Sequence, residues 1–144
     1  MTKAIDVNVL LYASDASSPF HARAREFLDS SASGSEIVYL AWITAMAYLR
    51  VATHPAIFAS PLSPDEAVRN LEALLRRPRV RLLAEEEGFW DIYREVIDGV
   101  VVRGNLVTDA HLAALLRQHG VRRLYTNDAD FRKFRFLDVR NPFN

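Results

Sequence analysis

Residues 3–12, Lys-Ala-Ile-Asp-Val-Asn-Val-Leu-Leu-Tyr, decide the fold. The first four residues of this stretch predict a short strand that ends on Asp6, and residues 7–12 predict a helical turn that follows directly. The same order recurs along the chain, where the compact apolar run Ile37-Val38-Tyr39-Leu40 is again followed by a helical segment. Strands that alternate with helices indicate an α/β fold, with a mostly parallel central sheet and helices on both faces.

The remaining elements are predicted from periodicity and from helix start and stop signals. Ser63, Pro64 and Glu66 form a capping box with proline at the first helical position, which predicts a helix start there. Gly120 is placed to end the last long helix. We expect further strands at residues 37–40, 80–83, 122–126 and 136–139, and helices at residues 20–31, 42–52, 64–76, 86–102 and 106–119.

The composition is that of an ordinary globular protein. The 144 residues are 50% hydrophobic and 25% charged, which fits one domain over residues 1–144 with its own core. No cysteine is present, which excludes a disulfide framework and a thiolate metal site. No stretch approaches the roughly twenty apolar residues of a membrane span, so we expect a cytoplasmic protein without membrane contact. The net charge of zero permits nucleic-acid binding without arguing for it.

Three aspartates are placed where their carboxylates could meet. Asp6 ends the first predicted strand and Asp128 follows the strand at 122–126, and ligands of an open parallel sheet bind beyond the carboxyl ends of its strands. Asp109 shares a helix face with Leu112 and Leu116, so the spacing puts a carboxylate where a core residue belongs. Asp109 also suits the start of a helix, and Asp6 also suits a turn. Taken together, the three favour a shared cation site, because a buried charge needs a cation or strong hydrogen bonds.

A site of this kind suits the hydrolysis of a phosphodiester. Carboxylate oxygens are hard ligands for Mg²⁺ or Mn²⁺, and these ions keep open positions for water and for phosphate oxygens. A bound metal lowers the pKa of its water and neutralises negative charge in the transition state. Carboxylates without a metal would instead repel an RNA backbone, so we expect the cation to be part of the chemistry.

Four segments, in this order, resemble the motifs of PIN-domain ribonucleases of the VapC toxin type. They are Asp6–Tyr12, Tyr48–Pro55, Leu106–Ala114 and Thr126–Phe131. Each segment alone is a weak signal, whereas the ordered set is specific and covers nearly the whole chain. The resemblance implies a PIN-like α/β/α sandwich with a mostly parallel central sheet.

The resemblance also implies roles for individual residues and for partners. The catalytic metal ligands would be Asp6, Asp109 and Asp128. Hydrogen bonds that orient ligands or water would come from Asn8, Thr126 and Asn127. Similar proteins cut RNA endonucleolytically by means of metal-activated water, pair with a cognate VapB-type antitoxin and commonly form homodimers.

One position departs from the family pattern. Many PIN nucleases carry a glutamate in the helix before the Leu-Arg pair at 49–50, and this chain has Ala47 there. No acid lies between Glu36 and Asp65, which leaves three core carboxylates, with Asp130 as a candidate fourth ligand. The alternative to an active ribonuclease is therefore a catalytically weakened PIN-like module that binds RNA or a protein partner.

Two other folds for phosphoryl chemistry also place aspartates at strand ends. A haloacid-dehalogenase-like phosphatase needs a second aspartate two residues after the first, where this chain has Asn8. A receiver domain needs a lysine after a later strand, and the only lysines, Lys3 and Lys133, are not placed for it. The phosphatase remains an alternative to the ribonuclease, and a less favoured one.

Basic and aromatic side chains complete the set of candidates. Arginine binds phosphate in a bidentate manner, and the candidate RNA contacts are Arg76, Arg77, Arg79, Arg132 and Lys133. The alternative for each is an ordinary solvated surface. Trp42 and Trp90 are predicted to belong to the core. His111 lies two positions after Asp109 and points about 200° around the helix from it, which predicts a surface or subsite role.

Overall fold

The five strands form one parallel sheet in the computed structural model, which describes residues 1–144. They are β1 (Thr2–Ile5), β2 (Ile37–Ala41), β3 (Val80–Leu83), β4 (Arg123–Tyr125) and β5 (Asp138–Arg140), in the spatial order β3-β2-β1-β4-β5. Each strand is parallel to its neighbours. The chain builds outward from β1 through β2 and β3, and then returns to the other side of β1 for β4 and β5. Parallel α/β sheets bind ligands where the strand order reverses in this way.

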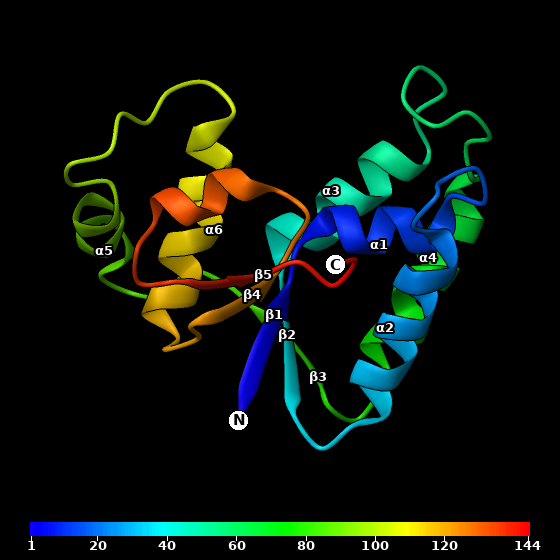
Figure 1. Cartoon of the computed structure of the whole chain (residues 1–144), viewed down its shortest axis with the longest axis horizontal. Helices are drawn as coiled ribbons and strands as arrows, with labels where there is room; N and C mark the ends of the chain where they lie inside the picture. Colours follow the sequence, from blue (N-terminus) through cyan, green and yellow to red (C-terminus); the bar gives the residue numbers. More distant parts are fainter.

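Six α-helices and a short 3₁₀ helix, η1 (Ala129–Lys133), accompany the sheet. The α-helices are α1 (Val7–Ser14), α2 (His21–Ser33), α3 (Trp42–Ala52), α4 (Pro64–Leu75), α5 (Phe89–Val96) and α6 (Leu106–Gln118). Figure 1 shows α1, α2 and α4 on one side of the sheet and α5 and α6 on the other, and α3 packs against α1 and α4. The predicted α/β/α sandwich is confirmed. None of the helices combines the length and the apolar character that crossing a membrane requires.

Two separate hydrophobic cores lie on the two faces of the sheet. One contains Val9 of α1 and Tyr48 of α3, and the other contains Leu116 of α6 and Phe131 of η1. Successive strand residues supply opposite cores, since Ala4 belongs to the α6 side and Ile5 to the α1 side. This alternation follows from the twofold side-chain period of a strand. The central strands are therefore held from both faces, and their carboxyl ends are fixed in place.

The element boundaries differ from the prediction by at most two residues except in α5, and the differences in α5 and β5 have a clear cause. The predicted helix at 86–102 is only residues 89–96, because Gly88 and Gly99 adopt φ values of 84° and 76° that a helix does not contain. The last strand is residues 138–140 instead of 136–139. The Leu137 amide donates to the Phe134 carbonyl at 3.1 Å, so residues 134–137 form a turn before the strand begins.

The two tryptophans do not belong to the core, and that prediction was wrong. Trp42 is 45% exposed at the start of α3, and Trp90 is 65% exposed on α5. On α5 the residues that pack on the core are Phe89, Ile92 and Tyr93, at helical spacings of three and four. Trp90 follows Phe89 by one residue, which turns it about 100° away from that face, where its ring stacks on Tyr93 at 5.6 Å.

Candidate active site

Four aspartates gather at the carboxyl ends of the two central strands. β1 and β4 are adjacent, and the Asp6 amide donates to the Tyr125 carbonyl at 3.0 Å, which ties the two strand ends together. Asp6, Asp109 and Asp128 line one cavity of about 160 Å³. Oxygen atoms of Asp109, Asp128 and Asp130 lie within 4.8 Å of one another. The structure thus brings together all three predicted ligands and the candidate fourth.

Asp6 is the most constrained of the four carboxylates. It is 8% exposed and caps the N-terminus of α1, where Oδ1 accepts a hydrogen bond from the Val7 amide at 2.8 Å. Oδ2 accepts a hydrogen bond from the Thr126 hydroxyl, also at 2.8 Å. Burial raises the pKa of Asp6, the bonds from Thr126 and Val7 lower it, and the charge of Asp128 raises it again, with a net increase. The carboxylate is therefore held in place by neutral donors with no cation beside it.

The predicted supporting residues form a connected network around Asp6. The Asn8 amide group donates to Thr126 Oγ1 at 3.0 Å, and the backbone amide of Asn127 donates to Asn8 Oδ1 at 3.2 Å. Thr126 Oγ1 also accepts from the backbone amide of Asp128 at 3.0 Å. One hydroxyl thus links two of the acids. Asn8, Thr126 and Asn127 therefore contact one another beside the acids, and their role in orienting ligands or water stays a prediction.

Asn127 is itself held by two residues that the sequence did not single out for this role. Its side-chain amide donates to the Tyr12 hydroxyl at 3.3 Å, and Asn141 donates to Asn127 Oδ1 at 2.7 Å. The side chain of Asn141 also accepts from the Phe143 amide at 2.8 Å, and the Phe143 ring packs on Tyr12 with centroids 5.4 Å apart. The C-terminal segment therefore holds the Asn127 side chain, which lies next to Asp128, in place. No local signal marks Asn141, because its contact depends on how β5 pairs with β4.

Asp109 has the most perturbed acid–base equilibrium in the site. Its pKa is raised to about 7, first by burial and then by repulsion from Asp128, Asp6 and Asp130, while Lys133 lowers it. Asp109 lies in the first turn of α6 and is itself half-buried. A carboxyl that resists ionisation among other carboxylates indicates a surplus of negative charge. A bound cation would remove that surplus and ionise Asp109.

Asp130 differs from the other three acids because it is exposed and already paired. Its Oδ1 lies 3.5 Å from Lys133 Nζ. Its backbone amide donates to Asp128 Oδ1 at 2.9 Å, so the two residues form one tight turn at the start of η1. Asp130 is close enough to contribute a ligand atom, but releasing it for that purpose would break the pair with Lys133.

The donor set fits a hard divalent cation. The acidic side chains in and beside the cavity supply carboxylate oxygens, and no histidine or cysteine lies among them. Oxygen ligands of this kind suit Mg²⁺ and Mn²⁺ better than Zn²⁺ or Cu²⁺. The position two residues after Asp6, where a haloacid-dehalogenase-like enzyme needs its second aspartate, is Asn8, which is committed to Thr126 and Asn127. The geometry therefore disfavours the phosphatase.

Ala47 lines the same cavity. It lies on α3 together with the lining residues Ile43 and Thr44, and Asp109 and Asp128 line the same cavity. The alanine that stands where many PIN nucleases have a glutamate is thus part of the cavity wall. A glutamate at this position would have added a carboxylate from the α3 side, whereas this chain offers only a methyl group there.

The five basic candidates fall into two groups. The first group precedes β3 and comprises Arg76, Arg77 and Arg79. It lies at the amino edge of the sheet, opposite the acids. Two of these arginines form salt bridges, Arg76 with Glu72 at 3.3 Å and Arg77 with Asp29 at 3.4 Å. Arg132 and Lys133 belong to η1, directly after Asp128. Only this second group is brought close to the acid cluster.

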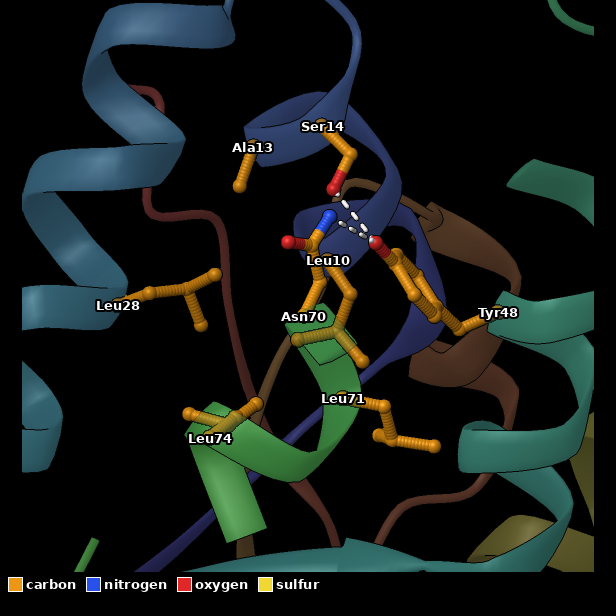
Figure 2. Close-up of a pocket in the computed structure, with 8 residues that line it drawn as sticks. All are labelled: Leu10, Ala13, Ser14, Leu28, Tyr48, Asn70, Leu71 and Leu74. Atoms are coloured by element: carbon orange, nitrogen blue, oxygen red, sulfur yellow. Dashed lines mark hydrogen bonds between the residues drawn. The ribbon is translucent and has the colours of Figure 1, made fainter. Parts of the chain in front are cut away.

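A second cavity, of about 120 Å³, lies among α1, α2, α3 and α4 (Figure 2). Half of its eight lining residues are leucine. The Tyr48 hydroxyl is hydrogen bonded to Ser14 at 2.7 Å and to Asn70 at 3.2 Å. This cavity holds no acid or base for phosphodiester chemistry, so the aspartate cavity is the candidate active site.

Comparison with known proteins assigns the family. A model of the PIN domain matches residues 3–137. The chain is 46% identical to Ribonuclease VapC48 of Mycobacterium tuberculosis over 144 residues, which is 100% of this chain and 99% of that protein. The chain belongs to the VapC group of PIN-domain proteins. It is also 35% identical to Ribonuclease VapC37 of the same organism over 132 residues, covering 92% of this chain and 91% of that protein.

Solved structures share the PIN fold at low sequence identity. VapBC2 from Rickettsia felis, bound to a DNA fragment from its promoter, matches with a TM-score of 0.71 and 15% identity, over 98% of both chains. VapC20 of Mycobacterium tuberculosis, described as a toxin that cleaves the sarcin-ricin loop, matches with a TM-score of 0.69 and 18% identity, over 96% of this chain and 98% of that one. At these identities the similarity establishes the fold alone.

Proposed function

We propose that this chain is a metal-dependent endoribonuclease, the toxin of a toxin–antitoxin pair, built as a single PIN domain over residues 1–144. The observation that carries the proposal is the cavity in which Asp6, Asp109 and Asp128 converge with a surplus of negative charge. That surplus is unfavourable in the protein alone and would be relieved by a divalent cation, which can in turn bind the oxygens of a phosphodiester. The two relatives named as ribonucleases match 100% and 92% of the chain, which supports the same activity here.

The residues of the site have distinct tasks in this proposal. Asp6, Asp109 and Asp128 hold Mg²⁺ or Mn²⁺, and the bound ion supplies activation of water and neutralisation of the phosphate charge. Thr126 orients the Asp6 carboxylate through its 2.8 Å hydrogen bond. Its hydroxyl also accepts hydrogen bonds from Asn8 and from the Asp128 backbone amide, which keeps Asp128 beside Asp6. Asp130, which is paired with Lys133, is the candidate fourth ligand. Hydrolysis then needs no nucleophile from the protein, because the attacking group is water.

Ala47 limits how much charge the site can hold. With a methyl group on the α3 side, the ligands all come from β1, α6 and the turn after β4. We expect this arrangement to bind one divalent ion more tightly than a second. The alternative, a weakened PIN-like module that binds RNA without cutting it, has the same geometry and is separated from the nuclease by a cleavage assay.

The proposed partners follow from the relatives. Solved neighbours with the same fold are VapBC complexes from Rickettsia felis and Haemophilus influenzae, so we further propose a cognate VapB-type antitoxin for this chain. We also propose a homodimer, since Trp42 and Met46, one helical turn apart on α3, are 45% and 49% exposed and form an apolar face that a second copy would cover. The substrate, cellular RNA, would place the reaction in the cytoplasm.

The test is cleavage of purified total RNA by the intact chain and by Asp6→Asn, with Mg²⁺, with Mn²⁺ and with EDTA. Asparagine can still cap α1, so this variant removes the carboxylate without removing the helix cap. Asp91→Asn is the matched control, because Asp91 is exposed on α5, away from the cavity. Metal-dependent cutting by the chain and by Asp91→Asn, but not by Asp6→Asn, supports the proposal. If the folded, Mn²⁺-binding chain does not cut RNA, the weakened binding module is correct instead.

A further inference from the structure

A wide groove lies next to the aspartates and has the opposite charge. It encloses about 680 Å³ between the loop that follows α5 and the segment that begins at the end of η1. Its cationic lining residues are Arg132, Lys133 and Arg135, and its single acid is Asp98. Both segments lie on the α6 side of the sheet (Figure 1). The volume is within the range of about 300–1,000 Å³ that small ligands occupy, so a nucleotide unit fits.

Lys133 joins the groove to the acid cluster. Its side chain lines the groove, and its Nζ lies 3.5 Å from Asp130 Oδ1. Asp130 in turn has an oxygen within 4.8 Å of Asp109 and Asp128 oxygens. The groove is therefore separated from the acid cluster only by the ion pair between Lys133 and Asp130.

The groove offers donors that nothing else in the chain uses. Arg132 and Arg135 are exposed and form no salt bridge, whereas Arg76 and Arg77 on the opposite edge are both paired. The backbone amides of Gly99 and Val101, in the loop that forms the facing wall, donate to no group within the chain. Guanidinium groups and free amides are the donors that bind phosphate oxygens.

The negative charge of the acid cavity and the positive charge of the groove together indicate a ligand with several phosphates. A strand of RNA that crosses the acid cavity brings further phosphates beside three aspartates, and their mutual repulsion opposes binding even when a cation covers the scissile phosphate. We propose that Arg132 and Arg135, with Lys133 between them and the acids, bind the phosphates of single-stranded RNA that flank the scissile bond. This inference rests on the proposed function. It assigns the substrate path to the η1 side of the site and not to the edge that carries Arg76 and Arg79.

Binding is measured in EDTA, by fluorescence anisotropy of a labelled single-stranded RNA, so that the readout does not depend on cleavage. The chain is compared with Arg132→Gln, Arg135→Gln and the double variant over a series of salt concentrations. Arg69→Gln is the matched control, because Arg69 is an exposed arginine on α4 that forms no salt bridge. Arg132→Lys keeps the charge and separates electrostatic attraction from packing.

We expect the Kd to rise about fivefold for each cation removed, the share of one contact in electrostatic binding to nucleic acid. The slope of log Kd against log salt should fall by about 0.7 for each cation, and Arg69→Gln and Arg132→Lys should leave it unchanged. A double variant that binds RNA with the affinity and salt slope of the unchanged chain would overturn the proposal. Wild-type binding that the double variant loses, without cutting in Mn²⁺, would uphold the groove and reject the nuclease.

Discussion

Replacement of Asp109 by asparagine should stabilise the metal-free protein near pH 8 and abolish its metal-dependent activity. In the folded state the pKa of Asp109 is about 7, above the value of about 3.9 expected for an unfolded chain. Between these two pH values the folded chain binds more protons than the unfolded chain, so the free energy of unfolding falls as the pH rises. Asparagine resembles the neutral carboxyl and removes this loss.

The size of the effect follows from the pKa difference. A difference of about 3 between folded and unfolded states corresponds to about 4 kcal/mol, which we reduce to about 2 kcal/mol because water screens a half-buried carboxyl. For a chain of this length, 2 kcal/mol corresponds to about 6 °C in Tm. Asp109→Asn should therefore melt about 6 °C above the unchanged chain at pH 8 in EDTA, and only about 2 °C above it at pH 5, where roughly a third of the loss is already present because the unfolded chain is ionised.

Circular dichroism melting at the two pH values, with and without Mn²⁺, is the assay. Mn²⁺ should raise the Tm of the unchanged chain, since the ion binds only the folded state, and should do so much less for Asp109→Asn. Asp91→Asn serves as the control for removing one surface acid. Equal or lower stability of Asp109→Asn at pH 8 would refute the account of Asp109 as a repelled carboxylate. A gain that persists undiminished at pH 5 would show that its cause is not ionisation.

Three further substitutions test the remaining parts of the site. Thr126→Val removes the donor to Asp6 and should lower the free energy of unfolding by about 2 kcal/mol in urea at pH 8, whereas an unchanged midpoint would mean that this hydrogen bond contributes nothing. Ala47→Glu adds a carboxylate to the cavity wall, so it should tighten Mn²⁺ binding by calorimetry and lower the Tm in EDTA; weaker binding would show that the α3 side does not face the ion. Asn141→Ala releases the Asn127 side chain and should weaken Mn²⁺ binding less than Thr126→Val does, and a larger effect would contradict the order of the network.

The sequence predicts that the aspartates converge because the signals are local and the geometry of a parallel sheet is general, whereas their role as metal ligands stays a prediction. A strand that ends on Asp6 and a strand followed by Asp128 must meet at one sheet edge if both belong to a parallel sheet, and the structure has β1 and β4 adjacent. The rotation of about 200° that separates His111 from Asp109 on the helix also agrees with the structure. His111 forms a hydrogen bond with Glu85 and packs on Phe89 instead of facing the acids.

The features that the sequence does not predict depend on contacts between distant segments. Trp90 lies outside the core because the packed face of α5 is occupied by Phe89 and Tyr93. The bracing of Asn127 by Asn141 depends on β5 lying beside β4, and the α5–η1 groove depends on a loop whose path Gly99 sets through its positive φ. Neither residue spacing nor composition contains this information.

The position of the site explains how a cluster of carboxylates is compatible with a stable fold. The acids lie at the ends of β1 and β4, between two cores of 15 buried residues each, and neither core includes an aspartate. The loss of about 2 kcal/mol that burial and repulsion together cause at Asp109 is small beside the apolar burial of Leu116, Phe131 and their neighbours, at roughly 1.5–3 kcal/mol for each large side chain. The metal-free chain should therefore remain folded, with the Asp6 carboxylate held by Thr126 and the α1 N-terminus. The same rigidity keeps the ligands in position before the ion arrives, so that binding energy is not consumed in ordering the site.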